Sequence, residues 1–134
     1  MPTSDDPMRS MAFLICQRVD PHPEKGTCSV QDIFFEGSAP QFPAGVTGYF
    51  FACLASDPNT EHQIEIRMVQ PGDIETLSLM TTTIRFTVTQ ERNYLYVPFE
   101  AVFYLPGRYI MQLWEGESLL AESPLVLRLQ ATPG

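Results

Sequence analysis

The segment from residue 20 to residue 24 holds the side chains of this chain that come closest to a set of metal ligands. Asp20, His22 and Glu24 alternate with Pro21 and Pro23, so one short loop offers three side chains of ligand type. Two prolines in the loop favour a rigid turn exposed to water instead. The chain has only two histidines and no C-x-x-C pair to complete a site. We therefore expect no metal ion and no other cofactor.

Four acids lie in pairs in two later turns, where a calcium site on a β-sandwich would need them. Asp57 and Glu61 fall in one turn, and Asp73 and Glu75 fall in another. Calcium takes about six to eight oxygen ligands, so several acids must converge from neighbouring loops. These turns hold only scattered acids, and solvated turn residues are the simpler interpretation.

Cys28 or Cys53 could act as a nucleophile only beside a histidine base that a third group orients. Cys53 lies in the apolar segment VTGYFFACLA, residues 46–55, where a thiol behaves as a small core hydrophobe. The chain also contains no G-x-S-x-G elbow and no glycine-rich loop that would hold a phosphate. We therefore expect a protein without enzymatic activity.

Aromatic residues gather in one later segment: Tyr94, Tyr96, Phe99, Phe103 and Tyr104. Aromatic rings on an open sheet face can stack on sugar rings, so a carbohydrate-binding module is an alternative function. Filling of the core explains most of these residues more simply, because strands favour aromatic side chains.

Trp114 is the best candidate for an exposed aromatic anchor, since it stands at the end of a strand beside a turn. Strict alternation places Ile110, Trp114 and Val126 on one face of a final hairpin. The opposite set, expected to face the core, is Tyr109, Met111, Leu113, Leu125 and Leu127. Exposed apolar patches often mark contacts with another protein, and Trp is a preferred anchor there. Ile110, Trp114 and Val126, interrupted by Gln112 and Arg128, form the predicted interaction surface.

The charge balance excludes several kinds of partner. The chain of 134 residues carries 8 Lys and Arg against 16 Asp and Glu, which gives a net charge of −8. No basic cluster is present that could bind nucleic acid or an anionic membrane surface. No segment approaches the roughly 18 apolar residues of a membrane span. The expected partner is therefore a protein, either a second copy of the chain or another protein.

The opening segment MPTSDDPMRSMAFLIC does not resemble a secretory signal. Acids precede its apolar stretch, and no basic region stands before that stretch. The three cysteines form an odd number without the spacing of a disulfide framework. We expect a cytoplasmic protein in which Cys16, Cys28 and Cys53 are unpaired and Cys53 is buried.

Alternation of apolar and polar residues dominates the chain and predicts β-strands. The predicted strands are residues 11–19, 28–37, 46–55, 62–69, 84–90 and 94–103, followed by a hairpin over residues 106–129. Residues 74–81 fit either a short strand or a single helical turn. Segment 46–55 is apolar on both faces, which is typical of a central strand.

Seven or eight short strands without a long helical pattern predict an all-β fold. We expect an immunoglobulin-like antiparallel β-sandwich, with an open β-barrel as the alternative. Residues 11–130 would form this single domain. A flexible arm of residues 1–10 would precede it, and a tail of residues 131–134 would follow it.

Three short motifs resemble a family of short bacterial β-sandwich proteins that is catalogued as a domain of unknown function. The first strand ends in Cys16-Gln17-Arg18, an aromatic-rich segment precedes the turn Phe42-Pro43-Ala44, and the last hairpin opens with Pro106-Gly107-x-Tyr109. The resemblance covers residues 12–129 and implies a fold, but it assigns no site. We therefore expect a non-enzymatic β-sandwich that acts through protein contacts, with carbohydrate binding as the alternative and enzymatic activity ranked third.

Overall fold

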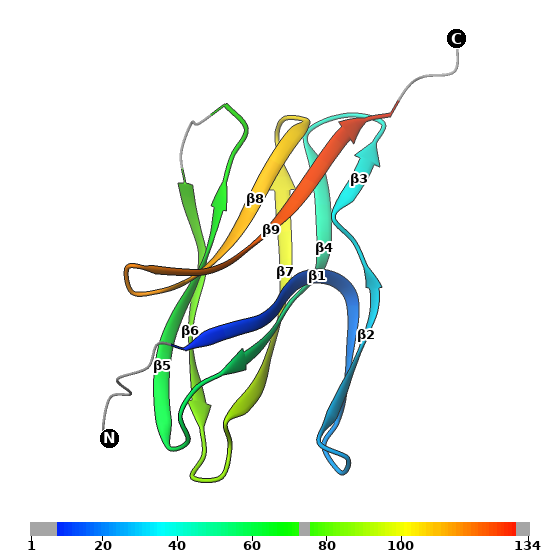
Figure 1. Ribbon diagram of the computed structural model, residues 1–134. Helices are drawn as coiled ribbons and strands as arrows, with labels where there is room; N and C mark the ends of the chain where they lie inside the picture. Colours follow the sequence, from blue (N-terminus) through cyan, green and yellow to red (C-terminus); the bar gives the residue numbers. More distant parts are fainter. Residues whose placement is uncertain (1–7, 73–75, 131–134) are drawn as a thin grey trace.

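Two facing β-sheets make up the computed structural model of the protein (Figure 1), which describes residues 8–72 and 76–130. The nine strands in this part of the chain are β1 (Arg9–His22), β2 (Thr27–Ile33), β3 (Glu36–Ala39), β4 (Ala44–Ala55), β5 (Thr60–Val69), β6 (Thr76–Phe86), β7 (Arg92–Phe103), β8 (Gly107–Glu115) and β9 (Ser118–Leu129). One sheet has the order β2-β1-β4-β7, and the other has the order β3-β9-β8-β5-β6. The predicted all-β, immunoglobulin-like sandwich is thereby confirmed.

The core between the sheets follows from the alternation along the strands. β4 lies between β1 and β7, as predicted for a segment that is apolar on both faces. Its inward side chains include Phe50, which is stacked on Phe99 of β7 with ring centres 4.5 Å apart. On β5, Ile64, Ile66 and Met68 point inward as expected and are almost fully buried.

The second predicted strand, residues 28–37, is in fact two strands in different sheets. β2 ends at Ile33, just after Asp32, whose φ of 55° interrupts the extended backbone. The chain then crosses to the other sheet, where β3 pairs with β9 in parallel. The sandwich therefore has nine strands in its described residues instead of seven or eight, and one of its strand pairs is not antiparallel.

Residues 74–90 also differ from their predicted arrangement. The structure has one strand, β6, from Thr76 to Phe86, in place of two separate segments. The alternation of Ile84, Phe86 and Val88 predicts that all three face inward, but Val88 is 72% exposed. The strand ends before it, because a turn closed by the bond from Gln90 N–H to the Thr87 carbonyl follows at once.

The N-terminal boundary lies earlier than expected. β1 begins at Arg9, and Met8 is only 1% exposed, so the expected arm of residues 1–10 does not extend to residue 10. Its residues 1–7 and the expected tail of residues 131–134 lie outside the described residues. Within residues 8–72 and 76–130, no helix is long and apolar enough to cross a membrane.

Candidate binding surfaces

The predicted surface of Ile110, Trp114 and Val126 lies on the outer face of the five-stranded sheet. All three side chains are half-buried. The set predicted to face the core is at most 5% exposed: Tyr109, Met111, Leu113, Leu125 and Leu127. The hairpin of β8 and β9 and its two faces are therefore as predicted. No observation yet tests a role of this surface in binding, and that role stays a prediction.

Polar neighbours hold Trp114 on this face. The guanidinium carbon of Arg67 lies 4.4 Å from the centre of the indole ring, a cation–π contact. The indole N–H donates to Gln112 Oε1 at 2.9 Å. Arg67 also pairs with Glu65, whose other carboxylate oxygen accepts a bond from Ser78 at 2.7 Å. The bond from Ser78, and then that from Arg67, lowers the pKa of the Glu65 carboxyl.

The contacts of Trp114 with Arg67 and Gln112 separate it from the other two residues of the predicted patch, Ile110 and Val126. Ile110 is opposite Val69 on β5 and Pro124 on β9, and Val126 lies two residues along β9. Trp114, by contrast, belongs to a polar stack with Arg67 and Gln112. The apolar area that Trp114 can offer to a partner is therefore smaller than strand alternation alone suggests.

The candidate metal loop is tied into the hairpin of β1 and β2. Asp20 accepts bonds from Arg18 and from Gln31, each at 2.9 Å. His22 Nε2 lies 2.9 Å from Ser29 Oγ. Within the part of the chain that the structure describes, no group of three or more His, Cys, Asp or Glu side chains is arranged to hold a metal ion.

Of the two turns considered as a calcium site, the structure describes the one that holds Asp57 and Glu61. Glu61 pairs with Arg85 across β5 and β6, with 2.9 Å between Oε2 and Nε. Asp73 and Glu75 lie outside the described residues.

The three cysteines are unpaired, as predicted, but the buried one is Cys16 and not Cys53. The prediction for Cys53 is wrong because this side chain points to the outer face of the four-stranded sheet, opposite Tyr94 on β7 and Ala12 on β1. Burial raises the pKa of the Cys16 thiol. Burial, and after it the charge of Asp20, raises the pKa of Cys28.

We expect a thiol reagent at neutral pH to modify Cys28 and Cys53 before Cys16. Cys16 is 0% exposed, and its raised pKa leaves little thiolate, the reactive form. Timed labelling followed by peptide mass mapping measures the order, with urea-unfolded protein as the control in which all three react. Labelling of Cys16 as fast as Cys53 in the native protein would contradict the buried position.

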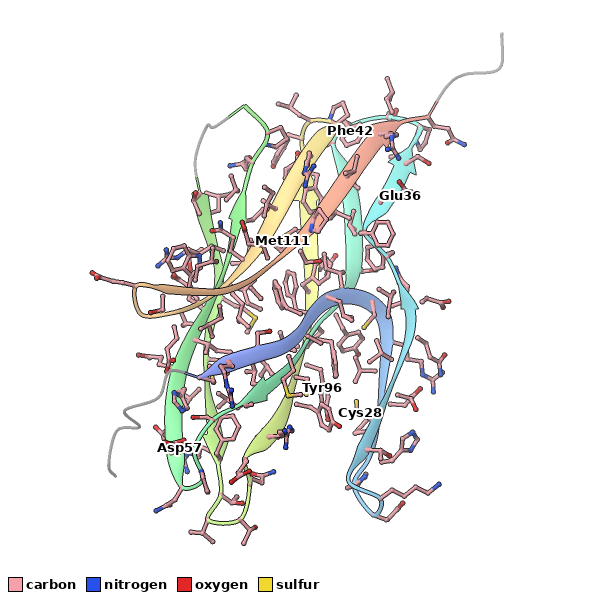
Figure 2. All side chains as sticks on the ribbon, in the orientation of Figure 1. Cys28, Glu36, Phe42, Asp57, Tyr96 and Met111 are labelled. Carbon is pink, nitrogen blue, oxygen red and sulfur yellow. The ribbon has the colours of Figure 1, made fainter. Side chains whose placement is uncertain are left out.

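Two tyrosines of β7 project from the outer face of the four-stranded sheet. Tyr96 is opposite Phe51 of β4, and Tyr94 is opposite Cys53. The rings of Phe51 and Tyr94 are stacked with their centres 5.8 Å apart. Tyr94 is 41% exposed and Tyr96 is 40% exposed; Figure 2 labels Tyr96 on the lower half of β7. Leu14 of β1 is opposite Phe51 on the same face, and Phe51 itself is buried beneath its neighbours. The aromatic face is defined by five residues: Leu14, Phe51, Cys53, Tyr94 and Tyr96.

The remaining aromatic residues of this segment divide between the core and the surface. Phe99 packs on Phe50, and Phe103 meets Tyr109 edge to face at 4.8 Å, so both fill the core as predicted. Tyr104 is 72% exposed beyond the end of β7. The sequence does carry a signal for the aromatic face, since Tyr94 and Tyr96 alternate with Leu95 and Val97.

A polar cluster that sequence analysis missed lies at one end of the sandwich. His62, on the inward side of β5, is 8% exposed. Its Nδ1 bonds to Glu115 Oε2 at the end of β8, and its Nε2 lies 2.7 Å from Ser56 Oγ. Thr60 Oγ1 is 3.1 Å from the same Nε2. The edge of the imidazole faces the Phe86 ring, with centres 5.7 Å apart.

Ser56, His62 and Glu115 have the hydroxyl–imidazole–carboxylate order of a hydrolase triad. Their other contacts favour a structural role. The Ser56 N–H donates to the Glu91 carbonyl at 3.0 Å, so it is not available to stabilise an oxyanion. The Thr60 hydroxyl donates to the Asp57 carbonyl at 2.7 Å, and its oxygen lies beside the same imidazole nitrogen as Ser56 Oγ. The cluster thus satisfies the buried polar groups that join β4, β5 and β8.

The fold and these surfaces define an immunoglobulin-like β-sandwich with exposed tyrosines on one sheet. Residues 11–128 match the family of unknown function DUF6941, and the chain belongs to this family. The predicted resemblance to a family that is catalogued as a domain of unknown function is thereby confirmed. None of the curated proteins matches the sequence.

Several solved structures resemble the fold. A β-glucosidase from Listeria innocua matches with a TM-score of 0.55 at 6% identity, over 91% of this chain and 16% of that one. A GH3 β-glucosidase from Bifidobacterium adolescentis matches with a TM-score of 0.52 at 6% identity, over 90% of this chain and 17% of that one. An immunoglobulin-like protein from Pseudomonas aeruginosa matches at 12% identity, over 94% of this chain and all of that one, with a TM-score of 0.48. The chain spans about one sixth of the glucosidases' length, and this likeness shows the fold alone.

Proposed function

We propose that the protein is a non-enzymatic β-sandwich that acts through protein contacts, and that its aromatic face joins two copies of the chain. The observation that carries this proposal is the exposure of Tyr94 and Tyr96 beside Phe51 on an open sheet. Tyrosine is enriched in protein interfaces, where it supplies a large apolar area and a polar hydroxyl group. The predicted patch of Ile110, Trp114 and Val126 is the rival surface.

The charges around the aromatic face favour a second copy as its partner. Along the outer side of β7, Arg92 precedes Tyr94 and Tyr96, and Glu100 follows them. Among the described residues, neither Arg92 nor Glu100 forms an ion pair. In a two-fold pair of copies with Tyr96 near the axis, β7 of one copy runs antiparallel to that of the other. Arg92 of each copy then comes opposite Glu100 of the other.

The absence of enzymatic activity is part of the proposal. It is supported by the hydrogen bonds of the Ser56–His62–Glu115 cluster, which occupy the Ser56 N–H and share the imidazole with Thr60. A fluorophosphonate probe, which labels activated serines, should leave the wild type and a Ser56→Ala variant equally unlabelled. Stoichiometric labelling of Ser56 would instead promote the hydrolase alternative.

We further propose that the protein works in the cytoplasm and has no nucleic acid or membrane partner. The three unpaired thiols are compatible with a reducing compartment. The net charge of −8 opposes contact with polyanions.

Replacing Tyr94 and Tyr96 together by serine is expected to weaken self-association by about 2 kcal/mol, or roughly thirtyfold in the dissociation constant. The change removes the two exposed rings but none of the core. Sedimentation equilibrium at physiological salt, where charge repulsion is screened beyond about 8 Å, measures the association. Thermal melts serve as the control for folding.

Exchange of the charges at residues 92 and 100 tests the proposed antiparallel arrangement of the two β7 strands. Arg92→Glu and Glu100→Arg should each weaken association, because each brings like charges together across the axis, and the double variant should restore it. A wild type that stays monomeric at millimolar concentration would overturn the proposal. If Trp114→Ala abolishes association and the double serine variant does not, the two copies meet through the predicted patch of Ile110, Trp114 and Val126 instead. Binding of the tyrosine-dependent face to a glycan array instead would favour the carbohydrate alternative.

A further inference from the structure

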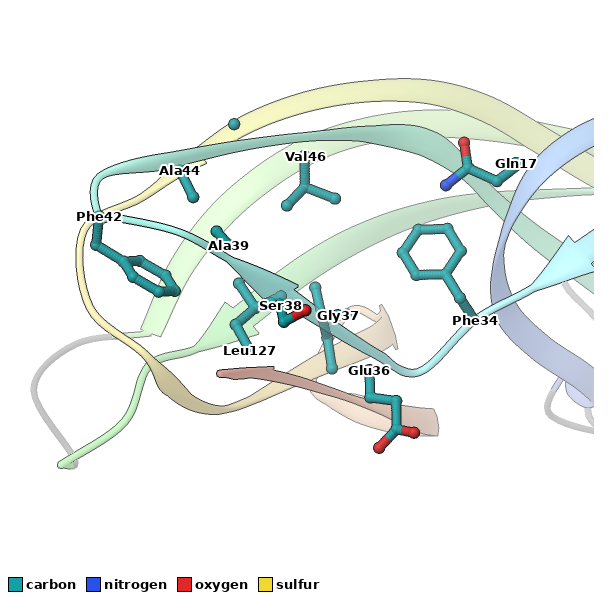
Figure 3. A pocket seen from close by; sticks show the side chains of 12 residues that line it. Gln17, Phe34, Glu36, Gly37, Ser38, Ala39, Phe42, Ala44, Val46 and Leu127 are labelled. Carbon is teal, nitrogen blue, oxygen red and sulfur yellow. The ribbon is translucent and has the colours of Figure 1, made fainter. Parts of the chain in front are cut away.

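An apolar pocket of about 270 Å³ opens between the two sheets at the edge formed by β3 (Figure 3). Phe34 and Phe42 lie on opposite sides of it in the close-up. Val46 of β4 and Leu125 and Leu127 of β9 supply further apolar walls. None of these residues belongs to the aromatic face, so the pocket is a separate feature of the molecule.

The pocket exists because small residues line it where larger ones would fit. The inward positions of β3 are Gly37 and Ala39, and Ala44 of β4 lies on the other wall. A Cβ atom built on Gly37 would lie 3.5 Å from Leu127 Cδ2, which is an ordinary contact. Protein interiors hold few voids larger than a water molecule, and voids cost stability. Small residues on both walls therefore indicate a space that an occupant fills.

The polar groups at the pocket define the chemistry of that occupant. The carboxamide of Gln17 turns toward the pocket between Phe34 and Val46 in Figure 3, and it has no hydrogen-bond partner among the described residues. The Glu36 carboxylate points away from the pocket, toward Arg128 Nη1 at 2.9 Å. The pocket thus offers aromatic and aliphatic walls, the Gln17 amide, the Ser38 hydroxyl and no facing charge.

We propose that this pocket binds a small, neutral aromatic molecule that carries one hydrogen-bonding group. An apolar cavity of about 150 Å³ is large enough to bind benzene, so a pocket of about 270 Å³ has room for a larger ring system. A bicyclic ring such as indole is a system of this kind. The two phenylalanine rings pack on the flat faces of the ligand, and the Gln17 amide bonds to its polar atom.

Indole is the probe for the test, with N-methylindole as the matched ligand that lacks the N–H donor. Titration followed by ¹H–¹⁵N correlation spectra should give saturable shifts at the amides of Gly37, Ala39 and Gly45, with a dissociation constant on the order of 0.1–1 mM. Gln17→Ala should weaken indole binding about fivefold. The same substitution should leave N-methylindole binding unchanged.

Filling the pocket should weaken indole binding without unfolding the protein. Ala39→Leu and Ala44→Leu each place a larger side chain in the space, from β3 and β4 respectively, and each should weaken indole at least tenfold. Val126→Ala, on the outer side of β9, should bind as the wild type does. Shifts that do not saturate at millimolar indole would overturn the proposal. Chemical-shift changes confined to amides outside the pocket would also overturn it, as would an indole affinity equal to that of the wild type in a folded Leu variant.

Discussion

Replacement of Gly48 by valine is expected to destabilise the protein by about 3 kcal/mol, near the upper end of the usual cost of overpacking. A Cβ atom at Gly48 would lie 2.8 Å from the carbonyl oxygen of Cys16 and 3.2 Å from Cε1 of Phe99. The first contact is with backbone, which cannot rotate away. β1 bends sharply where it passes β4 (Figure 1), and the absent side chain lets the two backbones approach.

Gly45→Val is the matched control for this substitution, since it lies on the same strand with nothing within 4 Å of its absent Cβ. Urea unfolding of both variants gives the two free energies of unfolding. The control should stay within about 1 kcal/mol of the wild type. Equal stability of the two variants would mean that β1 can move away from β4 at no cost.

The sequence correctly predicted which side chains are buried in strands that have one apolar face and one polar face. Ile64, Ile66 and Met68 of β5 alternate with polar residues, and this pattern alone locates them in the core. The final hairpin follows the same rule, with Gly116 in its turn at a φ of 57°. In these elements, local pattern and tertiary burial agree.

Alternation could not reveal where a strand changes sheets. The alternation of apolar and polar residues over 28–37 continues through Asp32. Asp can adopt the left-handed φ that the backbone has there, but an Asp in the sequence does not predict it. The parallel partner of β3 is β9, some 90 residues later in the chain. Likewise, the inward pattern of Ile84 and Phe86 runs on to Val88, although a turn has already ended β6.

The candidate sites depended on contacts that sequence does not show. Strand parity correctly placed Trp114 on the outer face, but Arg67, which covers one side of its ring, comes from β5. Cys53 was predicted to be buried because its segment is apolar on both faces, and a sheet face can be apolar without being covered. The space beside Gly37 and Ala39 exists only because β3 pairs with β9 in the other sheet and does not continue β2.

The His62 cluster was the least predictable feature, since its two best bonds join residues 6 and 53 positions apart. We expect His62→Leu to destabilise the protein by about 3 kcal/mol. The leucine would leave the Glu115 carboxylate, whose side chain is 27% exposed, without its partner. It would also leave the half-buried Ser56 hydroxyl without the Nε2 contact. Groups that lose a hydrogen-bond partner in a buried site cost about 1–3 kcal/mol each.

Glu115→Gln separates the hydrogen bond from the charge in this cluster. The Nδ1 of His62 bonds to a carboxylate oxygen of Glu115. The glutamine oxygen can accept the same Nδ1–H bond, so this variant should lose about 1 kcal/mol or less, whereas Glu115→Leu should lose about as much as His62→Leu. Urea unfolding at pH 8 compares the three variants. If Glu115→Gln is as damaging as Glu115→Leu, the negative charge of Glu115 is needed, and the hydrogen bond alone does not hold the pair.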